Sequence, residues 1–339
     1  MARKHVGALA GLGLVVGLFF GGRYVRHTYD RSSDMPGVSF RGDPGPPSAA
    51  ELELAASLER SVSFLADHLG PRSSDDPEAR AATLDWLAAR LVALGLAPVR
   101  EPFGDGRENL VLSFPSADTR ALLVLFSAHF DTVAGSPGAD DDASGVAVLL
   151  ELASAFAARP LADPVRGVEL VFFDGEEAGW DHMGSGFHAG VLADRGAEVA
   201  VAVSLEMLGY FTDEPDSQSF PGPFMGRWYP DRGDFLAFVG NRSSEAAIRA
   251  TIGAFRATAR VPSEGLAAPD SIDDVGRSDH AQFWRFGWPG LMVTDTADFR
   301  NESYHEPSDL GASLDFVRMA RSAVALEATL RALAAGLEL

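Results

Sequence analysis

One run of eight residues, Ala121 to Ala128 (ALLVLFSA), constrains the fold of this chain more than any other feature. The run has the length of a β-strand and is apolar without the alternation of a half-exposed strand. A strand of this kind is buried on both faces, which is typical of the parallel centre of a sheet. We therefore expect a mixed sheet with a parallel centre, covered by other elements on both faces.

Helical and strand patterns alternate along the rest of the chain. Apolar spacing predicts helices over residues 52–69, 76–95, 146–158, 243–258 and 314–333. Further strands are predicted over residues 109–114, 168–173, 199–205 and 290–294. This order predicts an α/β fold, a three-layer α/β/α sandwich with a mixed, centrally parallel sheet. The stretch 211–234, which contains Pro, Gly and aromatic residues, is predicted to be an irregular excursion over a site.

The composition restricts the chemistry that the chain can carry. No cysteine is present, which excludes disulfides, thiolate nucleophiles, iron–sulfur clusters and Cys-type zinc sites. Any bound metal must therefore be held by His, Asp or Glu. The 48 Asp and Glu residues outnumber the 28 Lys and Arg residues, giving a formal net charge of -20. This charge argues against a nucleic-acid partner or another polyphosphate ligand.

The first residues have the pattern of a targeting segment. An uncharged run from Val6 to Gly22, 17 residues long, is flanked by basic residues, Arg3 and Lys4 before it and Arg23 and Arg26 after it. As a helix it would be roughly 26 Å long, slightly shorter than a hydrocarbon core of roughly 30 Å. Because no small-residue cleavage site stands out after the run, an uncleaved apolar anchor helix is favoured over a removed signal peptide.

Three segments are therefore expected along the chain. Residues 1–27 form the anchor or signal segment. Residues 28–49, with several Pro and Gly residues, form an exposed linker. Residues 50–339 form one folded domain.

Ionisable residues follow the ends of the predicted strands, where α/β sheets place their sites. They are His129 and Asp131 after 121–128, Glu176 and Glu177 after 168–173, Glu206 after 199–205, the aspartates 140–142 before a helix, and His305 near the C-terminus. Each alone has an ordinary interpretation as solvated charge, a satisfied polar residue or a helix cap. Together, their like charges would repel one another unless a cation lay among them. Carboxylate and imidazole ligands suit zinc, and two metals bridged by one carboxylate would relieve the repulsion.

The local spacing of these residues indicates two further roles. In His129-x-Asp131 the side chains project to the same side of an extended chain, so Asp131 can accept the second N–H of the imidazole. Glu176 and Glu177 are neighbours whose side chains diverge. One of them can bind metal while the other takes a proton from water.

Six motifs occur here in the order and spacing of a known family. They are the string His129 to Asp131, PGADDDASGVAVLLELA (137–153), VFFDGEE (171–177), LEMLGY (205–210), SDHAQFW (278–284) and YHEPSD (304–309). On these motifs, residues 50–335 resemble the co-catalytic di-zinc exopeptidases, peptidase family 28 of clan MH. That aminopeptidase family also includes glutamate carboxypeptidase and the glutaminyl cyclases.

The resemblance implies a complete set of ligands for two Zn²⁺ ions, with other divalent metals left open. Asp141 would bridge the metals, with a cis peptide between Asp141 and Asp142. His129 and Glu206 would complete one site, and Glu177 and His305 the other. Glu206 departs from the family pattern, because many members have Asp there, and its extra methylene puts that site in doubt.

The implied function is a metal-dependent exopeptidase, an aminopeptidase that hydrolyses N-terminal residues from peptide substrates, with Glu176 as general base. A glutaminyl cyclase-like acyl transferase with one zinc is the main alternative, and a non-catalytic receptor-type ectodomain is a weaker one. The apolar N-terminus and the resemblance together place the protein outside the cytoplasm. It would be tethered to the membrane at the periplasmic side or cell surface, or secreted if the segment is cleaved.

Several other residues receive provisional roles. His280 and Tyr210 are candidate substrate contacts, although a structural role for His280 fits its motif equally well. Asp309 either orients His305 or caps a loop. The specificity pocket is expected between residues 211–234 and around 262–277. Its candidate lining residues are Phe224, Trp228 and Tyr229.

Overall fold

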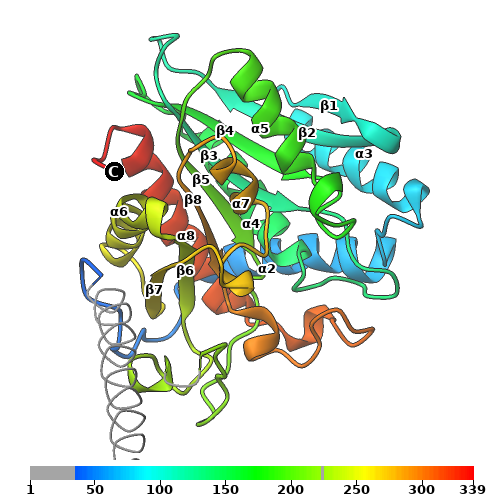
Figure 1. The fold of residues 1–339 in the computed structure, drawn as a ribbon. Helices are drawn as coiled ribbons and strands as arrows, with labels where there is room; N and C mark the ends of the chain where they lie inside the picture. Colours follow the sequence, from blue (N-terminus) through cyan, green and yellow to red (C-terminus); the bar gives the residue numbers. More distant parts are fainter. Residues whose placement is uncertain (1–34, 223–224) are drawn as a thin grey trace, which may run out of the picture.

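The computed structural model describes residues 35–222 and 225–339 (Figure 1). These residues contain one eight-stranded sheet, with the strand order β1-β2-β4-β3-β5-β8-β6-β7. The strands are β1 (Val99–Phe103), β2 (Arg107–Phe114), β3 (Leu123–His129), β4 (Gly167–Phe173), β5 (Val199–Glu206), β6 (Leu236–Asn241), β7 (Ser263–Ala268) and β8 (Gly290–Thr294).

The helices of the described residues pack on the two faces of this sheet. They are α2 (Ala49–Ser63), α3 (Pro77–Ala93), α4 (Ala143–Ala158), α5 (Gly184–Asp194), α6 (Glu245–Arg256), α7 (His280–Trp284) and α8 (Phe316–Ala334). A π-helical stretch, Phe64–Leu69, extends α2. Helices α2, α4, α6 and α8 contact one another on one face, and α5 contacts α7 on the other. The predicted α/β layering is thus observed.

The centre of the sheet is parallel. Strands β4, β3, β5 and β8 run in the same direction. On one side β2 and β1 are added antiparallel, and on the other side β6 pairs antiparallel with β8 and parallel with β7. The prediction of a mixed sheet with a parallel centre is confirmed. Because the central strands are parallel, their carboxyl ends all lie at one edge of the sheet.

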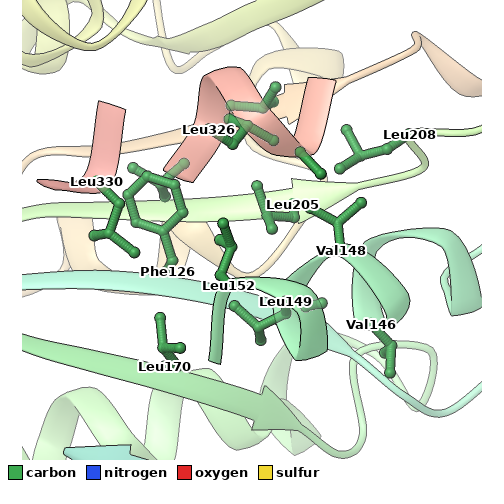
Figure 2. Packing of buried hydrophobic residues seen from close by; sticks show 14 of the residues in the cluster. Phe126, Val146, Val148, Leu149, Leu152, Leu170, Leu205, Leu208, Leu326 and Leu330 are labelled. Carbon is green, nitrogen blue, oxygen red and sulfur yellow. The ribbon is translucent and has the colours of Figure 1, made fainter. Parts of the chain in front are cut away.

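Strand β3 shows why its sequence is apolar throughout. Phe126 packs among Leu149 and Leu152 of α4 and Leu326 and Leu330 of α8 (Figure 2). Its neighbour Leu125 belongs instead to the cluster on the α5 face. Alternate side chains of one strand therefore enter different cores. Each such buried side chain contributes roughly 1.5–3 kcal/mol relative to an exposed one.

Five of the helices and strands listed above were not predicted from the sequence: β1, α5, β6, β7 and the five-residue helix α7. Strand β1 reads VREPF and lies at the edge of the sheet, where charged residues and Pro are tolerated. Helix α5 contains three glycines, which lowers its intrinsic helix propensity, and it forms where packing against β2 and α7 compensates. Strands β6 and β7 are short, and their pairing with β8 and with each other is non-local.

The described part of the predicted linker includes exposed residues such as Val38, but some of its residues pack on the folded domain. Residues 35–41, which we call the strap, lie along β7 and α6. Met35 is buried against Gly265, and Ser39 Oγ accepts a hydrogen bond from the Ser263 amide at 2.9 Å. Ser48 then begins α2 with a capping box that pairs it with Glu51. The strap is therefore part of the domain, since it covers the outer edge of the sheet.

The predicted N-terminal anchor helix, residues 1–27, lies outside the described residues. Among the described helices, none combines the length and the apolar character needed to cross a membrane.

A buried ionic network joins α5 to the sheet. The imidazole of His188 lies between two carboxylates, with Nδ1 at 3.0 Å from Glu101 of β1 and Nε2 at 3.0 Å from Glu169 of β4. Arg195 also pairs with Glu169 at 2.7 Å. Burial lowers the pKa of His188, but the two carboxylates outweigh it and raise the pKa to about 9. His188 is therefore a structural cation.

This network predicts a stability that falls at alkaline pH. The folded-state pKa of His188 lies above its unfolded value of about 6.5, so the stabilisation is complete below pH 6.5 and is lost as pH rises through about 9. The expected total loss is roughly 3 kcal/mol of unfolding free energy. Urea unfolding between pH 6 and 10 should show it in wild type and in the exposed control His68→Gln, but not in His188→Gln. If the unfolding free energy changed equally with pH in all three proteins, the result would contradict the assignment of His188 as the titrating group.

Candidate metal centre

Five candidate ligands converge at the carboxyl edge of the parallel strands. His129 ends β3 and Glu206 ends β5. Glu177 lies in the loop after β4, Asp141 lies just before α4, and His305 lies in the segment between β8 and α8. The topology of the sheet therefore brings together residues that are up to 176 positions apart in the sequence.

Asp141 lies at the middle of this group. Its Oδ1 is 3.2 Å from His129 Nε2, and its Oδ2 is 3.1 Å from His305 Nε2. His129 Nε2 is also 3.5 Å from Glu206 Oε1, and His305 Nε2 is 3.0 Å from Glu177 Oε1. Each oxygen of one carboxylate thus faces a separate pair, made of one imidazole and one further carboxylate.

The donor atoms of this group fit divalent metal ions. In the described part of the chain, His129 Nε2, His305 Nε2 and Asp141 Oδ1 are buried without a hydrogen-bond partner. Their separations of 3.0–3.5 Å match those of two ligand atoms that each lie about 2.0–2.2 Å from one tetrahedral ion. Nitrogen and oxygen donors of this kind suit zinc.

The charges of the group point the same way. Burial lowers the pKa of His129 and His305, but the facing carboxylates raise it in both, to about 10 in His305. Burial raises the pKa of Glu177 to about 7, with a further contribution from Asp141. The two imidazoles hold the pKa of Asp141 below its usual range, although burial opposes them. Several carboxylates therefore lie close together at this site, and positive charge beside them stabilises their ionised forms.

The three consecutive aspartates have separate tasks. Asp140 accepts hydrogen bonds from the Gly209 amide and the Asn301 side chain, which holds two loops at the site. Asp142 caps α4 through the Gly145 amide and also accepts from the Met207 amide. Only Asp141 presents an oxygen to each histidine, and its peptide bond to Asp142 is cis, as expected.

Asp142 lies closer to the metal centre than the sequence suggested. One of its carboxylate oxygens groups with ligand atoms of His129 and Glu206, all within 4.8 Å of one another. Its Oδ2 is buried without a hydrogen-bond partner among the described residues. Asp142 is therefore a further carboxylate beside His129 and Glu206. The sequence did not single it out, because an Asp just before a helix is ordinarily a helix cap.

The role predicted for Asp131 needs correction. The closest acceptor to His129 Nδ1 is the Asp131 backbone carbonyl at 3.1 Å, while the Asp131 carboxylate is 3.6 Å away. That carboxylate instead accepts the amides of Glu176 and Glu177, each at 3.1 Å. Asp131 therefore fixes the imidazole through its main chain and fixes the two-glutamate turn through its side chain.

Glu176 points into a different environment from its neighbour. It lines the cavity described below but lies outside the ligand pairs around Asp141. Burial, with the carboxylates of Glu206 and Glu177, raises its pKa well above the ordinary value, although His129 opposes this. A carboxyl group with a raised pKa beside a metal site is suited to exchange protons at neutral pH.

A cavity of about 310 Å³ opens from the metal centre. Asp141, Glu176, Glu177 and Glu206 form one end of it. The rest of the wall is largely apolar and comes from β6, β7, β8 and the loops around them, with Phe220, Met225, Tyr229, Phe235, Val239, Leu266, Ile272 and Met292. The cavity occupies the sheet face opposite α6, where α7 packs on β8 and the short 3-10 helix Asp273–Val275 contacts β6.

The predicted pocket residues have different outcomes. Tyr229 lines the cavity, as expected, whereas Trp228 is absent from the described lining and Phe224 lies outside the described residues. Tyr304 also lines the cavity and stacks on His305, with ring centroids 3.7 Å apart. Tyr304 was not assigned a role, and its only signal in the sequence was its place next to a predicted ligand.

Neither predicted substrate contact lies in the cavity wall. His280 is fully buried, donates from Nε2 to the Val275 carbonyl at 2.9 Å, and packs against Trp284. Burial lowers its pKa to about 4, so it is a neutral structural residue. Tyr210 is half-buried, and its amide donates to Asp295. Neither residue belongs to the cavity wall, since His280 begins the buried helix α7 and Tyr210 follows β5 in a loop, so a substrate contact for either stays a prediction.

Comparison with known proteins identifies the family. The family model described as Peptidase family M28 matches residues 109–329. The chain belongs to peptidase family M28. It is therefore a metal-dependent peptidase of that family, and the resemblance seen in its motifs is confirmed.

Two curated proteins match this M28 peptidase over most of its length. The uncharacterized protein YfbL of Escherichia coli is 34% identical over 289 residues, which cover 81% of this chain and 87% of YfbL. A probable zinc metalloprotease of Leptosphaeria maculans is 26% identical over 299 residues, which cover 78% of this chain and 66% of that protein.

Solved structures share the fold. The LapA aminopeptidase of Legionella pneumophila matches with a TM-score of 0.69 and 20% identity, covering 86% of this chain and 75% of LapA. A glutaminyl cyclase of Porphyromonas gingivalis matches with a TM-score of 0.60 and 21% identity, covering 81% of this chain and 97% of the cyclase.

Two residues hold the loops that carry the acidic ligands of this M28 site. The Asp309 carboxylate accepts the amides of Asp140 and Asp141 at 2.9 and 3.1 Å, so it caps this turn, the second of its two expected roles. Arg72 is completely buried and was not predicted. Its guanidinium donates to five main-chain carbonyls, those of Leu65, Gly70, Phe130, Pro137 and Gly138.

Arg72 is predicted to be required for stability. Arg72→Met leaves these carbonyls unpaired and removes a buried cation near the acidic loops, so the unfolding free energy should fall by roughly 3–5 kcal/mol. Urea unfolding monitored by circular dichroism measures it. The exposed control Arg120→Met should stay within about 0.5 kcal/mol of wild type. A similarly small effect for Arg72→Met would show that the loops are held by other contacts.

Proposed function

We propose that this protein is an aminopeptidase that uses two Zn²⁺ ions to hydrolyse the N-terminal residue from peptides. One observation carries the proposal: Asp141 presents one oxygen to each of two imidazole–carboxylate pairs at the end of an apolar cavity. The likeness to aminopeptidase structures and to a probable zinc metalloprotease supports it.

The residues divide into two metal sites. His129 and Glu206 would hold one ion, with Asp142 beside them, and Glu177 and His305 would hold the other. Asp141 would contribute one oxygen to each. Bound zinc is a Lewis acid that polarises a carbonyl and lowers the pKa of water toward about 7.

Glu176 is the proposed general base. Its carboxylate lies at the cavity wall, next to the ligand Glu177, and its backbone amide is held by Asp131. In this position Glu176 takes the proton from the attacking water and passes it to the leaving amine, so one carboxyl group serves both halves of the reaction. Its raised pKa favours the protonated form that the second half requires.

The cavity supplies the N-terminal specificity in this proposal. Its largely apolar wall accommodates the first side chain of a peptide, while the carboxylates at the metal end attract the free α-amine. A volume of about 310 Å³ is at the lower limit of roughly 300–1,000 Å³ for ligand pockets, which suits one side chain better than an extended peptide.

A glutaminyl cyclase-like acyl transferase with one zinc is the second candidate. Its support is the structural likeness to the Porphyromonas gingivalis cyclase and the longer side chain of Glu206 in the His129 site. The presence of both imidazole–carboxylate pairs favours two metals and hydrolysis instead.

We also propose that the protein acts outside the cytoplasm, tethered by its apolar N-terminal segment. The flanked run from Val6 to Gly22 supports this. Fractionation of cells expressing the full chain would place the protein with extracytoplasmic membranes, and a cytoplasmic protein would contradict the proposal.

The role of Glu176 gives a direct prediction. Glu176→Gln removes the proton acceptor but keeps the side-chain volume, so kcat for leucine p-nitroanilide should fall by roughly 10²–10⁴-fold. Elemental analysis should find the same zinc content as in wild type. The matched control Glu306→Gln, which neutralises an exposed carboxylate next to His305, should keep wild-type kcat. A kcat within tenfold of wild type in Glu176→Gln would refute the general-base role.

Metal content separates the two candidate functions. The zinc-loaded chain should contain about two zinc ions and lose hydrolysis on treatment with a chelator, with recovery when zinc is returned. His305→Ala should reduce the content to about one. One zinc in wild type, with cyclisation of N-terminal glutaminyl peptides and no anilide hydrolysis, would favour the transferase.

A further inference from the structure

A carboxylate lies in the wall of the cavity away from the metal centre. Glu264 of β7 lines the cavity and is 14% exposed. Side chains alternate along a strand, so Glu264 shares a face with Leu266 and Ala268, which pack in the apolar cluster beneath the cavity. The other charged residues of the described wall outside the metal centre are Asp274 and Arg277. Arg277 forms an ion pair with Asp298 at 2.7 Å and lies 3.8 Å from Asp274.

The partner of Glu264 comes from the strap. Arg41 ends the strap at the edge of the sheet, and its guanidinium forms an ion pair with the Glu264 carboxylate. The strap is held in place upstream of Arg41 by Met35 against Gly265 and by the hydrogen bond between Ser39 and Ser263. Figure 1 shows this blue segment beside β7. A residue more than 220 positions away in the sequence thus reaches the cavity wall.

Arg41 is the cation that offsets the acidic charge at this place. Burial raises the pKa of Glu264, and Arg41 lowers it. Arg41 also lowers the pKa of Asp234, whose Oδ1 is buried without a hydrogen-bond partner in the described ranges. Arg256 also lowers the pKa of Glu264, but its guanidinium donates hydrogen bonds to the carbonyls of Met35, Pro36 and Ser263, whereas Arg41 forms the ion pair. Without Arg41, the Glu264 carboxylate would lose its ion-pair partner at the wall of an apolar pocket.

We propose that Arg41 determines substrate specificity by neutralising Glu264, so that the cavity accepts a large uncharged first side chain and rejects a cationic one. The inference rests on the proposed aminopeptidase function. A Lys or Arg side chain entering the cavity meets a carboxylate that is already paired and a guanidinium of like charge, and it gives up its hydration without compensation. An apolar side chain meets neither the repulsion by a like charge nor the loss of a charged group's hydration.

The test compares kcat/KM for leucine, phenylalanine, lysine and arginine p-nitroanilides with the full zinc-loaded chain at low ionic strength. Wild type should prefer leucine and phenylalanine. In Arg41→Gln the lysine-to-leucine ratio should rise about tenfold or more, because Glu264 becomes available to pair with the substrate cation. The double variant Arg41→Gln/Glu264→Gln should return the ratio toward wild type. Glu264→Gln alone should lower the ratio, because Arg41 is then uncompensated.

The control is Arg159→Gln, which removes an exposed arginine from an ion pair with Glu327 on α8 and should leave the ratio unchanged. A lysine-to-leucine ratio within twofold of wild type in an Arg41→Gln enzyme that hydrolyses both substrates would overturn the inference and leave the aminopeptidase function standing. A zinc-loaded wild type that hydrolyses no anilide would overturn the proposed function, and the inference with it.

Discussion

The crowding of carboxylates at one edge of the sheet is the constraint on which the rest of this structure depends. Parallel strands must end together, and here β3, β4 and β5 each deliver acidic residues or histidine to the same edge. Glu176, Glu177 and Glu206 therefore meet Asp141 and its neighbours in a buried site. Like charges at this density raise one another's pKa, so the folded chain needs compensating positive charge there. Two divalent cations among two imidazoles would supply it.

The same acidity is used to hold the loops. Asp131, Asp142 and Asp309 all accept main-chain amides at the site, and each fixes a turn that carries a ligand or the proposed base. Hydrogen bonds between carboxylates and amides are stronger than neutral ones, and they position the loops without a layer of apolar packing. The buried cation Arg72 holds the same loops by donating hydrogen bonds to five main-chain carbonyls. These hydrogen bonds hold the loops so that their ligands keep a fixed orientation.

The cavity has a different physical origin. Helix α6 covers one face of β6 and β7, and the other face is left to the loops after β5 and β7. Loops fill space less completely than a helix, so an apolar hollow remains next to the metal centre. Residues from outside the sheet then affect this hollow: Tyr304 lines it beside His305, and Arg41 of the strap pairs with the lining residue Glu264.

The sequence by itself determined the layered fold with its parallel centre and the residues that would gather at the edge, because buried strands are unbroken apolar runs and ligands follow them directly. It also determined the choice of Asp141 among three aspartates through its motif. The tertiary structure alone decided the partners. It shows which amides the Asp131 carboxylate binds, that His280 and Tyr210 lie outside the cavity wall, that Arg72 holds the ligand loops, and that Arg41 pairs with Glu264. Those outcomes depend on contacts between distant segments, and hydrogen-bond partners of this kind leave no periodic signal in a single chain.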